Sequence, residues 1–189
     1  MEFLKSLRMK IGRNILRRKS LKQKRKTRYS SFSSVKNIGI VWDASDPAEF
    51  RVLSEFHKKM EERKISVSVL GYYPGHDLPA TYTAISFLTC LKRDDLGFPY
   101  LPGSGDAETF IKKGHDVLID LNFKNILPLQ YISSLSLAHF KVGIKDAGSD
   151  PVKSPFDLMI DMKKHDIKAF LDEAIRYLEM INTGDGKAA

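Results

Sequence analysis

The most distinctive chemistry in this sequence belongs to cationic side chains clustered in residues 1–28. This segment contains twelve lysines and arginines and one acidic residue, Glu2, so its charge is +11. The whole chain has a net charge of +8, which leaves −3 for residues 29–189. Clusters of this density bind polyphosphates, because each neutralised phosphate releases condensed counterions. The candidate nucleic-acid-binding residues are therefore Lys5, Arg8, Lys10, Arg13, Arg17, Arg18, Lys19, Lys22, Lys24, Arg25, Lys26 and Arg28.

A second set of polar side chains stands where predicted strands end. In an open parallel sheet, ligands bind beyond the carboxyl ends of the strands, so these residues are a candidate small-ligand pocket. The set consists of Asp43, Tyr72, Asn122 and Lys145, and Lys163 with Lys164 stands at a further strand end. Asp43 has an alternative, structural role, in which it shapes a turn together with Ser45 and Asp46 and caps the next helix. We favour that role, since no nearby residue completes a catalytic set.

The motifs of common enzymatic sites are absent from this sequence. The first predicted strand-to-helix turn, VWDASDPAE, has no glycine, whereas dinucleotide and P-loop sites need glycines for close approach to phosphate. There is no G-x-S-x-G motif, and the five histidines lack metal-like spacing. Asp116 and Asp120 are possible paired carboxylates, although a turn residue plus a strand-end polar residue is the commoner arrangement. We predict no catalytic residue, no metal and no cofactor, and we lean towards a protein that is not an enzyme.

Apolar runs and helical patterns alternate through the rest of the chain. Runs of strand length occur at residues 37–42, 66–73, 117–121, 140–144 and 156–162, and residues 82–91 fit either a strand or a short buried segment. Helical patterns occur at residues 46–64, 106–113, 128–138 and 166–181. This order is typical of parallel sheets with helices on both faces. It predicts a three-layer Rossmann-like α/β sandwich with a mostly parallel sheet of five or six strands, spanning residues 36–183. Residues 184–189 are expected to be a disordered tail.

The cationic segment is expected to be an arm that precedes this domain. Residues 1–19 have helical periodicity, and Gly12 weakens the predicted helix in its middle. The apolar stripe of this helix consists of Met1, Leu4, Leu7, Ile11 and Ile15. From residue 17 to residue 28 the charges crowd together, so this part is expected to be irregular until an anionic partner neutralises it. A linker at residues 29–34 completes the arm of residues 1–35.

Residues 116–145 carry a pattern found in a known enzyme fold. An apolar strand flanked by aspartates leads to a helical pattern and then to a short strand that contains a glycine. The matching residues are Asp116, Ile119, Asp120, Leu121, Ala138, Val142 and Gly143. The stretch resembles the N-terminal domain of heptosyltransferase-like GT-B glycosyltransferases, which implies a Rossmann-like fold. Those enzymes bind the nucleotide sugar chiefly with a second such domain, and this chain ends at Ala189 without one. The chain as a whole is also similar to an uncharacterised family of small bacterial α/β proteins with a basic N-terminus.

These observations favour a non-catalytic RNA-binding protein that associates with ribosomes through its cationic arm. RNA is favoured over a DNA site because no DNA-reading motif is present. Arginines can hold phosphates bidentately, and Tyr29 and Phe32 could stack on unpaired bases. One alternative is a peripheral protein whose amphipathic basic helix binds an anionic membrane surface. Another is a degenerate or partial glycosyltransferase-like enzyme. The helix could also simply pack on the protein's own acidic body.

A cytoplasmic location is expected from the same sequence. No apolar run approaches the roughly 20 residues of a membrane span. Cations interrupt the apolar residues near the N-terminus, so no secretory signal is predicted. The single cysteine, Cys90, cannot form an intramolecular disulfide and fits a reducing compartment.

Overall fold

The computed structural model describes residues 2–29, 31–145 and 154–181. Met1 and the predicted tail at residues 184–189 lie outside this range. The helices are α1 (Glu2–Lys22), α2 (Phe50–Glu62), α3 (Gly105–Lys112), α4 (Leu127–Leu135) and α5 (Ile167–Met180), with short 3₁₀ helices η1 (Phe32–Ser34), η2 (Pro47–Glu49), η3 (Ala80–Tyr82) and η4 (Arg93–Asp95). The strands are β1 (Asn37–Asp43), β2 (Ser66–Tyr72), β3 (Leu88–Leu91), β4 (Val117–Leu121), β5 (Phe140–Ile144) and β6 (Leu158–Ile160).

The described strands form one six-stranded sheet in the order β3-β2-β1-β4-β5-β6, and every neighbouring pair is parallel. Ile38 of β1 pairs with Val67 of β2 on one side and with Val117 of β4 on the other. The winding direction reverses between β1 and β4, which is the switch point where ligand sites of such sheets tend to form. The predicted α/β class and the parallel sheet are confirmed.

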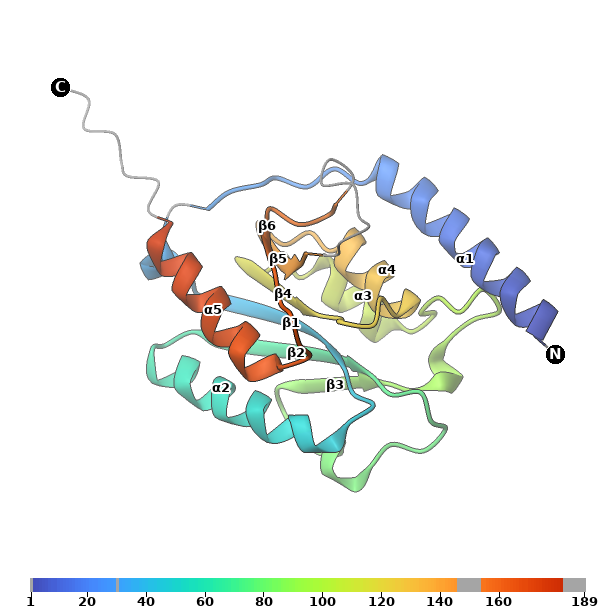
Figure 1. Ribbon diagram of the computed structural model, residues 1–189, viewed down its shortest axis with the longest axis horizontal. Coiled ribbons are helices and arrows are strands. Elements are labelled where there is room, and N and C mark those ends of the chain that lie inside the picture. Colours follow the sequence, from blue (N-terminus) through green and yellow to red (C-terminus); the bar gives the residue numbers. More distant parts are fainter. Residues whose placement is uncertain (1, 30, 146–153, 182–189) are drawn as a thin grey trace.

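Helices cover both faces of this sheet and make it a three-layer structure (Figure 1). Because side chains alternate along a strand, β1 supplies both cores. Ile40 and Trp42 face α2 and α5, where they pack in one cluster with Leu53 and Phe170. Val41 points the other way, into a cluster with residues of α3 and α4. The central strands therefore lack an exposed face, which explains their continuous apolar character.

Local signals explain most of the helix boundaries. Asp46 accepts a hydrogen bond from the backbone nitrogen of Ala48 and caps η2, and Asp43 accepts one from that of Ser45. The structural role expected for these residues is thus confirmed. The helix predicted for residues 46–64 is instead divided into η2 and α2. The last strand, β6, is shorter than the predicted run at residues 156–162.

The N-terminal segment differs from the expectation in two ways. First, α1 continues to Lys22, so residues 17–22 are helical rather than irregular. Second, residues 29–34 are not a simple linker, because Phe32 is only 6% exposed and belongs to the core formed with α5. Tyr29 packs against the same core, and its hydroxyl donates to the carbonyl of Leu178 at 2.6 Å. A base-stacking role for Phe32 is therefore excluded. Among the described residues, no helix combines the length and the apolar character that crossing a bilayer requires.

Candidate functional site

The cationic helix α1 is docked on the domain, along the outer side of α4 (Figure 1). Met9, Ile15 and Leu16 pack against a small apolar cluster that includes Leu127 and Tyr131 of α4. Of the described residues of the predicted stripe, only Ile15 takes part, whereas Leu4, Leu7 and Ile11 are 59%, 41% and 36% exposed. The expected buried face of α1 was therefore wrong at these three positions and correct at Ile15.

A glycine decides which face of α1 is docked. A Cβ atom on Gly12 would lie 2.2 Å from the carbonyl oxygen of Pro99 and 2.9 Å from a methyl carbon of Leu127. Real Cβ atoms do not approach backbone oxygens so closely, so only glycine allows α1 to lie against this loop. The residue that lowers helix propensity is thus the residue that allows close packing.

Polar contacts fasten the segment at three places along its length. The Nε of Arg8 donates to the carbonyl of Phe98, and the guanidinium lies 4.1 Å from the ring centroid of Tyr100. The Nζ of Lys19 donates to the hydroxyl of Tyr131 at 2.6 Å. Farther along, the Nε2 of Gln23 donates to the carbonyl of Leu135 at 2.8 Å. Part of the positive charge is therefore used to hold the segment in place.

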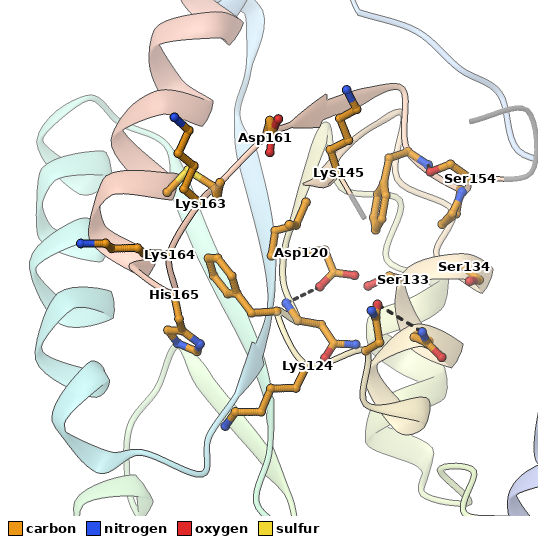
Figure 2. A pocket seen from close by; sticks show the side chains of 18 of the residues that line it. Asp120, Lys124, Ser133, Ser134, Lys145, Ser154, Asp161, Lys163, Lys164 and His165 are labelled. Atoms are coloured by element: carbon orange, nitrogen blue, oxygen red, sulfur yellow. Dashed lines mark hydrogen bonds between the residues drawn. The ribbon is translucent and has the colours of Figure 1, made fainter. Parts of the chain in front are cut away.

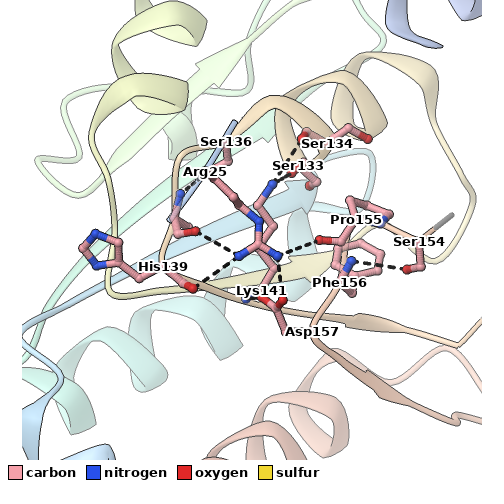
Figure 3. A network of polar contacts seen from close by, with 11 residues as sticks. Arg25, Ser133, Ser134, Ser136, His139, Lys141, Ser154, Pro155, Phe156 and Asp157 are labelled. Atoms are coloured by element: carbon pink, nitrogen blue, oxygen red, sulfur yellow. Dashed lines mark hydrogen bonds and ion pairs between the residues drawn. The ribbon is translucent and has the colours of Figure 1, made fainter. Parts of the chain in front are cut away.

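Arg25 makes the most extensive of these contacts (Figure 3). One of its terminal nitrogens lies 2.6 Å from the carboxylate of Asp157, and the same guanidinium contacts the carbonyls of Ala138, His139 and Pro155 at 3.3–3.5 Å. Asp157 also accepts a hydrogen bond from the backbone nitrogen of Lys141 at 2.8 Å. Arg25 therefore ties the end of the cationic segment to β5 and to the chain that leads into β6.

Most of the predicted cations nevertheless face solvent. Arg8 and Arg25 are partly buried, whereas the remaining ten of the twelve are exposed. These ten are Lys5, Lys10, Arg13, Arg17, Arg18, Lys19, Lys22, Lys24, Lys26 and Arg28. We call them the exposed cations. They extend from the first turns of α1 to the extended chain where the backbone nitrogen of Arg28 donates to the carbonyl of His139.

A pocket of about 840 Å³ lies beyond the carboxyl ends of β4, β5 and β6 (Figure 2). Its apolar walls include Phe123, Phe156 and Met162, and its polar lining comes from strand ends and from α4. The polar and charged lining residues are Asp120, Asn122, Lys124, Asn125, Gln130, Ser133, Ser134, Lys145, Ser154, Asp161, Lys163, Lys164 and His165. Pockets of this volume accommodate small organic ligands.

Two buried polar side chains, Asp120 and Ser133, face each other in this pocket (Figure 2). Asp120 is 5% exposed, and burial raises the pKa of its carboxyl to about 6. One of its oxygens accepts a hydrogen bond from the backbone nitrogen of Asn122 at 2.7 Å. Ser133 is 1% exposed, and its hydroxyl forms no hydrogen bond of normal geometry among the described residues. It nevertheless lies close enough to the Asp120 carboxyl to oppose, in part, the effect of burial on the pKa of that group. An unpartnered buried hydroxyl is uncommon, because leaving it unpaired costs free energy.

A lysine lies buried next to these groups. Lys141 of β5 is 1% exposed, and its Nζ donates to the carbonyls of Ser133 and Ser134 at 2.7 and 3.1 Å. Burial, assisted by the positive charge of Arg25, lowers the pKa of this amine to about 7. The two carbonyls belong to the last turns of α4, so Lys141 fixes the end of the helix that presents Ser133 to the pocket.

Cations surround the opening of the pocket. The Nζ of Lys124 lies 2.7 Å from the carboxylate of Asp43, and the Nε2 of His165 lies 2.5 Å from the carboxylate of Glu49. The exposed side chains of Lys145, Lys163 and Lys164 have no ion-pair partner within the described residues. Among the described residues, the opening therefore carries three lysines without a direct ion pair, together with one carboxylate, Asp161.

The structure brings together only part of the predicted pocket. Asn122 and Lys145 line it, as do Lys163 and Lys164 at the end of β6. Asp43 reaches it only through its ion pair with Lys124. Tyr72 is 9% exposed and lies in the core under α3 and α4 instead.

Sequence reasoning missed the two buried groups of the pocket. Asp120 was considered as one of two possible paired carboxylates, and the role of an ordinary strand-end residue was favoured. The other carboxylate of that pair, Asp116, binds the backbone nitrogens of Lys36 and Asn37 at 2.8 and 3.1 Å. A carboxylate inside the apolar strand VLIDL is the signal that would have identified Asp120, because an unpaired charge is rarely placed in a buried strand. Ser133 gave no comparable signal.

Comparisons with known proteins bear on the family and not on the chemistry. Curated proteins yield no match to this chain. A family model described as "Family of unknown function (DUF6913)" matches residues 8–181, which include α1 from Arg8 onward, the whole sheet and the pocket. The expectation of an uncharacterised family is confirmed, and the chain belongs to DUF6913.

Proposed function

We propose that this chain binds RNA, in ribosomal particles, through its exposed cations. The observation that carries this proposal is the placement of these ten side chains on solvent-facing positions of a segment that is itself docked on a rigid domain. Lys10, Arg13 and Arg17 follow one another at three- and four-residue spacing, so their side chains lie about 5–6 Å apart along the helix. Such a row can contact several phosphates at once.

The docking of α1 on the domain favours the binding of a partner to this row of cations. A flexible arm loses conformational entropy when it binds, and a helix already held in place loses less. Arg8, Lys19 and Arg25 supply that fixation through their own contacts with the domain. The exposed cations other than Lys19 are therefore available to a partner without a folding step.

A second candidate function rests on the exposed apolar residues of the first turns of α1. Phe3, Leu4 and Leu7 are 79%, 59% and 41% exposed, and Phe98, which contacts Arg8, is 60% exposed. Adjacent apolar and cationic side chains are typical of helices that lie on anionic membranes. We rank this function second, because the exposed cations continue past the helix to Arg28, where a membrane surface would require apolar side chains as well.

Sedimentation of lysate through a density gradient tests the first candidate with the full chain. The informative variant replaces four exposed cations that form no hydrogen bond or ion pair within the described residues, each by Gln; they are Arg13, Arg17, Arg18 and Lys22. The unaltered chain is expected to sediment with ribosomal particles at low salt and to leave them as salt rises. The variant is expected to stay at the top. With purified RNA, the slope of log K against log salt should fall by about 3 units in the variant.

A matched control removes four charges from a different surface. Arg51, Lys58, Lys59 and Lys168 lie exposed on α2 and α5, and replacing them by Gln changes the net charge equally. This control should still sediment with ribosomal particles. If it detaches as readily as the α1 variant, net charge alone drives the association and the proposed surface is wrong.

Binding to lipid vesicles distinguishes the membrane function from the RNA function. The probe is a vesicle of equal parts phosphatidylglycerol and phosphatidylcholine, and the variant carries Phe3→Ser, Leu4→Ser and Leu7→Ser. Binding to vesicles that the serine variant loses, together with absence from ribosomal particles, would replace the RNA proposal by the membrane one.

A further inference from the structure

The pocket beyond β4, β5 and β6 combines features that an ordinary surface hollow lacks. Its volume of about 840 Å³ is enclosed by apolar walls, buried polar groups and a cationic opening (Figure 2). It lies beside the point where the winding direction of the sheet reverses, because β4 is the strand at that junction. None of the exposed cations lines this pocket, although Leu16 of α1 does.

The cations of the opening favour an anionic ligand. Lys145, Lys163 and Lys164 line the pocket at the ends of β5 and β6 together with Asp161, and none of the three lysines forms an ion pair within the described residues. Three like charges around one opening repel each other, and an anion placed among them relieves this repulsion. A phosphate group fits this role, since its oxygens accept several hydrogen bonds from ammonium groups.

The buried groups favour a ligand that also carries hydroxyls. The Asp120 carboxylate accepts one hydrogen bond from the backbone nitrogen of Asn122 and has further acceptor capacity. The hydroxyl of Ser133 faces this carboxyl and forms no hydrogen bond of normal geometry with the described residues. A ligand hydroxyl can donate to the carboxylate and accept from Ser133, which would satisfy both groups together. Inorganic phosphate could not contact the lysines and the buried groups at the same time, because the Asp120 carboxylate would repel it.

We propose that this pocket binds a small phosphate monoester that carries hydroxyl groups, with its phosphate among Lys145, Lys163 and Lys164 and its hydroxyls against Asp120 and Ser133. The side chains of Phe123 and Phe156 then cover the carbon skeleton of the ligand. Gly143 of β5 shapes this wall, because a Cβ atom there would lie 2.4 Å from the ring of Phe156. The proposal concerns binding, and it is independent of RNA association at α1.

The test uses ribose 5-phosphate as the probe, with ribose and inorganic phosphate as its two halves. Amide chemical-shift changes in a ¹⁵N-labelled full chain report both the affinity and the location of binding. Ribose 5-phosphate is expected to shift the amides of residues 122–125 and 163–165, and to bind at least about tenfold more tightly than either half, since it engages both sets of groups. Equal affinity for ribose 5-phosphate and inorganic phosphate would overturn the hydroxyl part of the proposal. Absence of shifts at these residues with millimolar probe would overturn the site itself.

Two kinds of variant separate the roles of the pocket groups. Asp120→Asn keeps an oxygen that can accept from Asn122, and it should weaken ribose 5-phosphate about tenfold or more. Inorganic phosphate, no longer repelled by the carboxylate, should bind at least as tightly as before. The double variant Lys163→Gln, Lys164→Gln should weaken both probes, and more strongly at low salt. The control Lys58→Gln, at an exposed position of α2, should change the affinity for neither probe.

Ser133→Ala distinguishes a loss of ligand binding from a loss of folding. Because its hydroxyl makes no hydrogen bond with the described protein, this variant should unfold at the same or a higher denaturant concentration than the unaltered chain. Its affinity for ribose 5-phosphate should nevertheless fall severalfold. Unchanged affinity in both Ser133→Ala and Asp120→Asn would show that the buried groups do not contact the ligand, and would refute the proposal.

Discussion

The guanidinium of Arg25 lies 2.6 Å from the carboxylate of Asp157, and this ion pair joins the cationic N-terminal segment to the chain entering β6. Both side chains are mostly buried, at 17% and 18% exposed. The same guanidinium contacts the carbonyl of Pro155, whose neighbour Phe156 forms a wall of the pocket. The two candidate binding surfaces thus share one anchoring residue.

Arg25→Gln is expected to lower the free energy of unfolding by about 1–3 kcal/mol, the usual range for a lost hydrogen bond to a charged, partly buried group. The Asp157 carboxylate would then keep only its bond from the backbone nitrogen of Lys141. Urea titration followed by circular dichroism measures the change. Arg176→Gln is the matched control, because its ion pair with Glu173 is solvent-exposed and its loss should have a much smaller effect on stability. Equal losses in the two variants would show that the Arg25 contacts add nothing to stability.

The variant Gly12→Ala tests whether the docking of α1 depends on close packing at Gly12 or on the helix propensity of the segment. Alanine favours a helix over glycine by about 1 kcal/mol, yet its Cβ atom would meet the carbonyl of Pro99. We expect α1 to detach, so that its amides and those of residues 97–101 exchange with deuterium faster. Asn14→Ala, which alters an exposed position of the same helix, should leave exchange slow. Slow exchange in Gly12→Ala would mean that the close approach to Pro99 is not needed for docking.

The contrast between β4 and α1 shows which parts of the fold were predictable. VLIDL is buried at all five positions, so its apolar character alone identified the strand. For α1, by contrast, the apolar residues Leu4, Leu7 and Ile11 have the spacing of a buried stripe but remain exposed. The docked face is chosen by shape, through Gly12, and shape complementarity with a loop about 90 residues away leaves no periodic signal.

The pH dependence of stability should reveal the buried amine of Lys141. Its pKa is about 7 in the folded chain, against an ordinary value of 10.5. Between these values the unfolded chain binds the additional proton, so the free energy of unfolding rises with pH over this window. In Lys141→Met this contribution is absent. The stability of the unaltered chain minus that of the variant should therefore increase from pH 7 to pH 10, as measured by urea titration. A constant difference would refute the lowered pKa.

A buried histidine should lower the free energy of unfolding at acid pH. Both ring nitrogens of His115 lack a hydrogen-bond partner among the described residues, and burial lowers the pKa of the ring to about 4. The unfolded chain binds more protons between pH 4 and pH 6.5, so the free energy of unfolding falls as the pH decreases through this window. His115→Leu should remove that fall, and at pH 7 it should be at least as stable as the unaltered chain, because no polar atom is then left unpaired. A parallel acid-induced loss in both chains would contradict the assignment.

The pocket residues that directly follow strand ends could be predicted from the sequence, and those on other elements could not. Asn122 and Lys145 stand directly after β4 and β5, so the general rule for parallel sheets identified them. Ser133 comes from a helix, and its approach to Asp120 depends on how α4 packs on the sheet (Figure 2). That packing is fixed by contacts such as those of Lys141 with the end of α4, which join residues on different elements and leave no trace in local sequence.

The contacts that dock α1 also have a consequence during protein synthesis. Lys19 binds a partner 112 residues further along the chain, and Arg25 binds one 132 residues further along. At about 5–20 residues per second, a ribosome needs on the order of 10 s to add that much chain. Throughout that interval Met9, Ile15 and Leu16 have no apolar cluster to cover them, and the helix cannot yet occupy its final place. A partner that recognises α1 in its docked orientation therefore distinguishes finished chains from nascent ones.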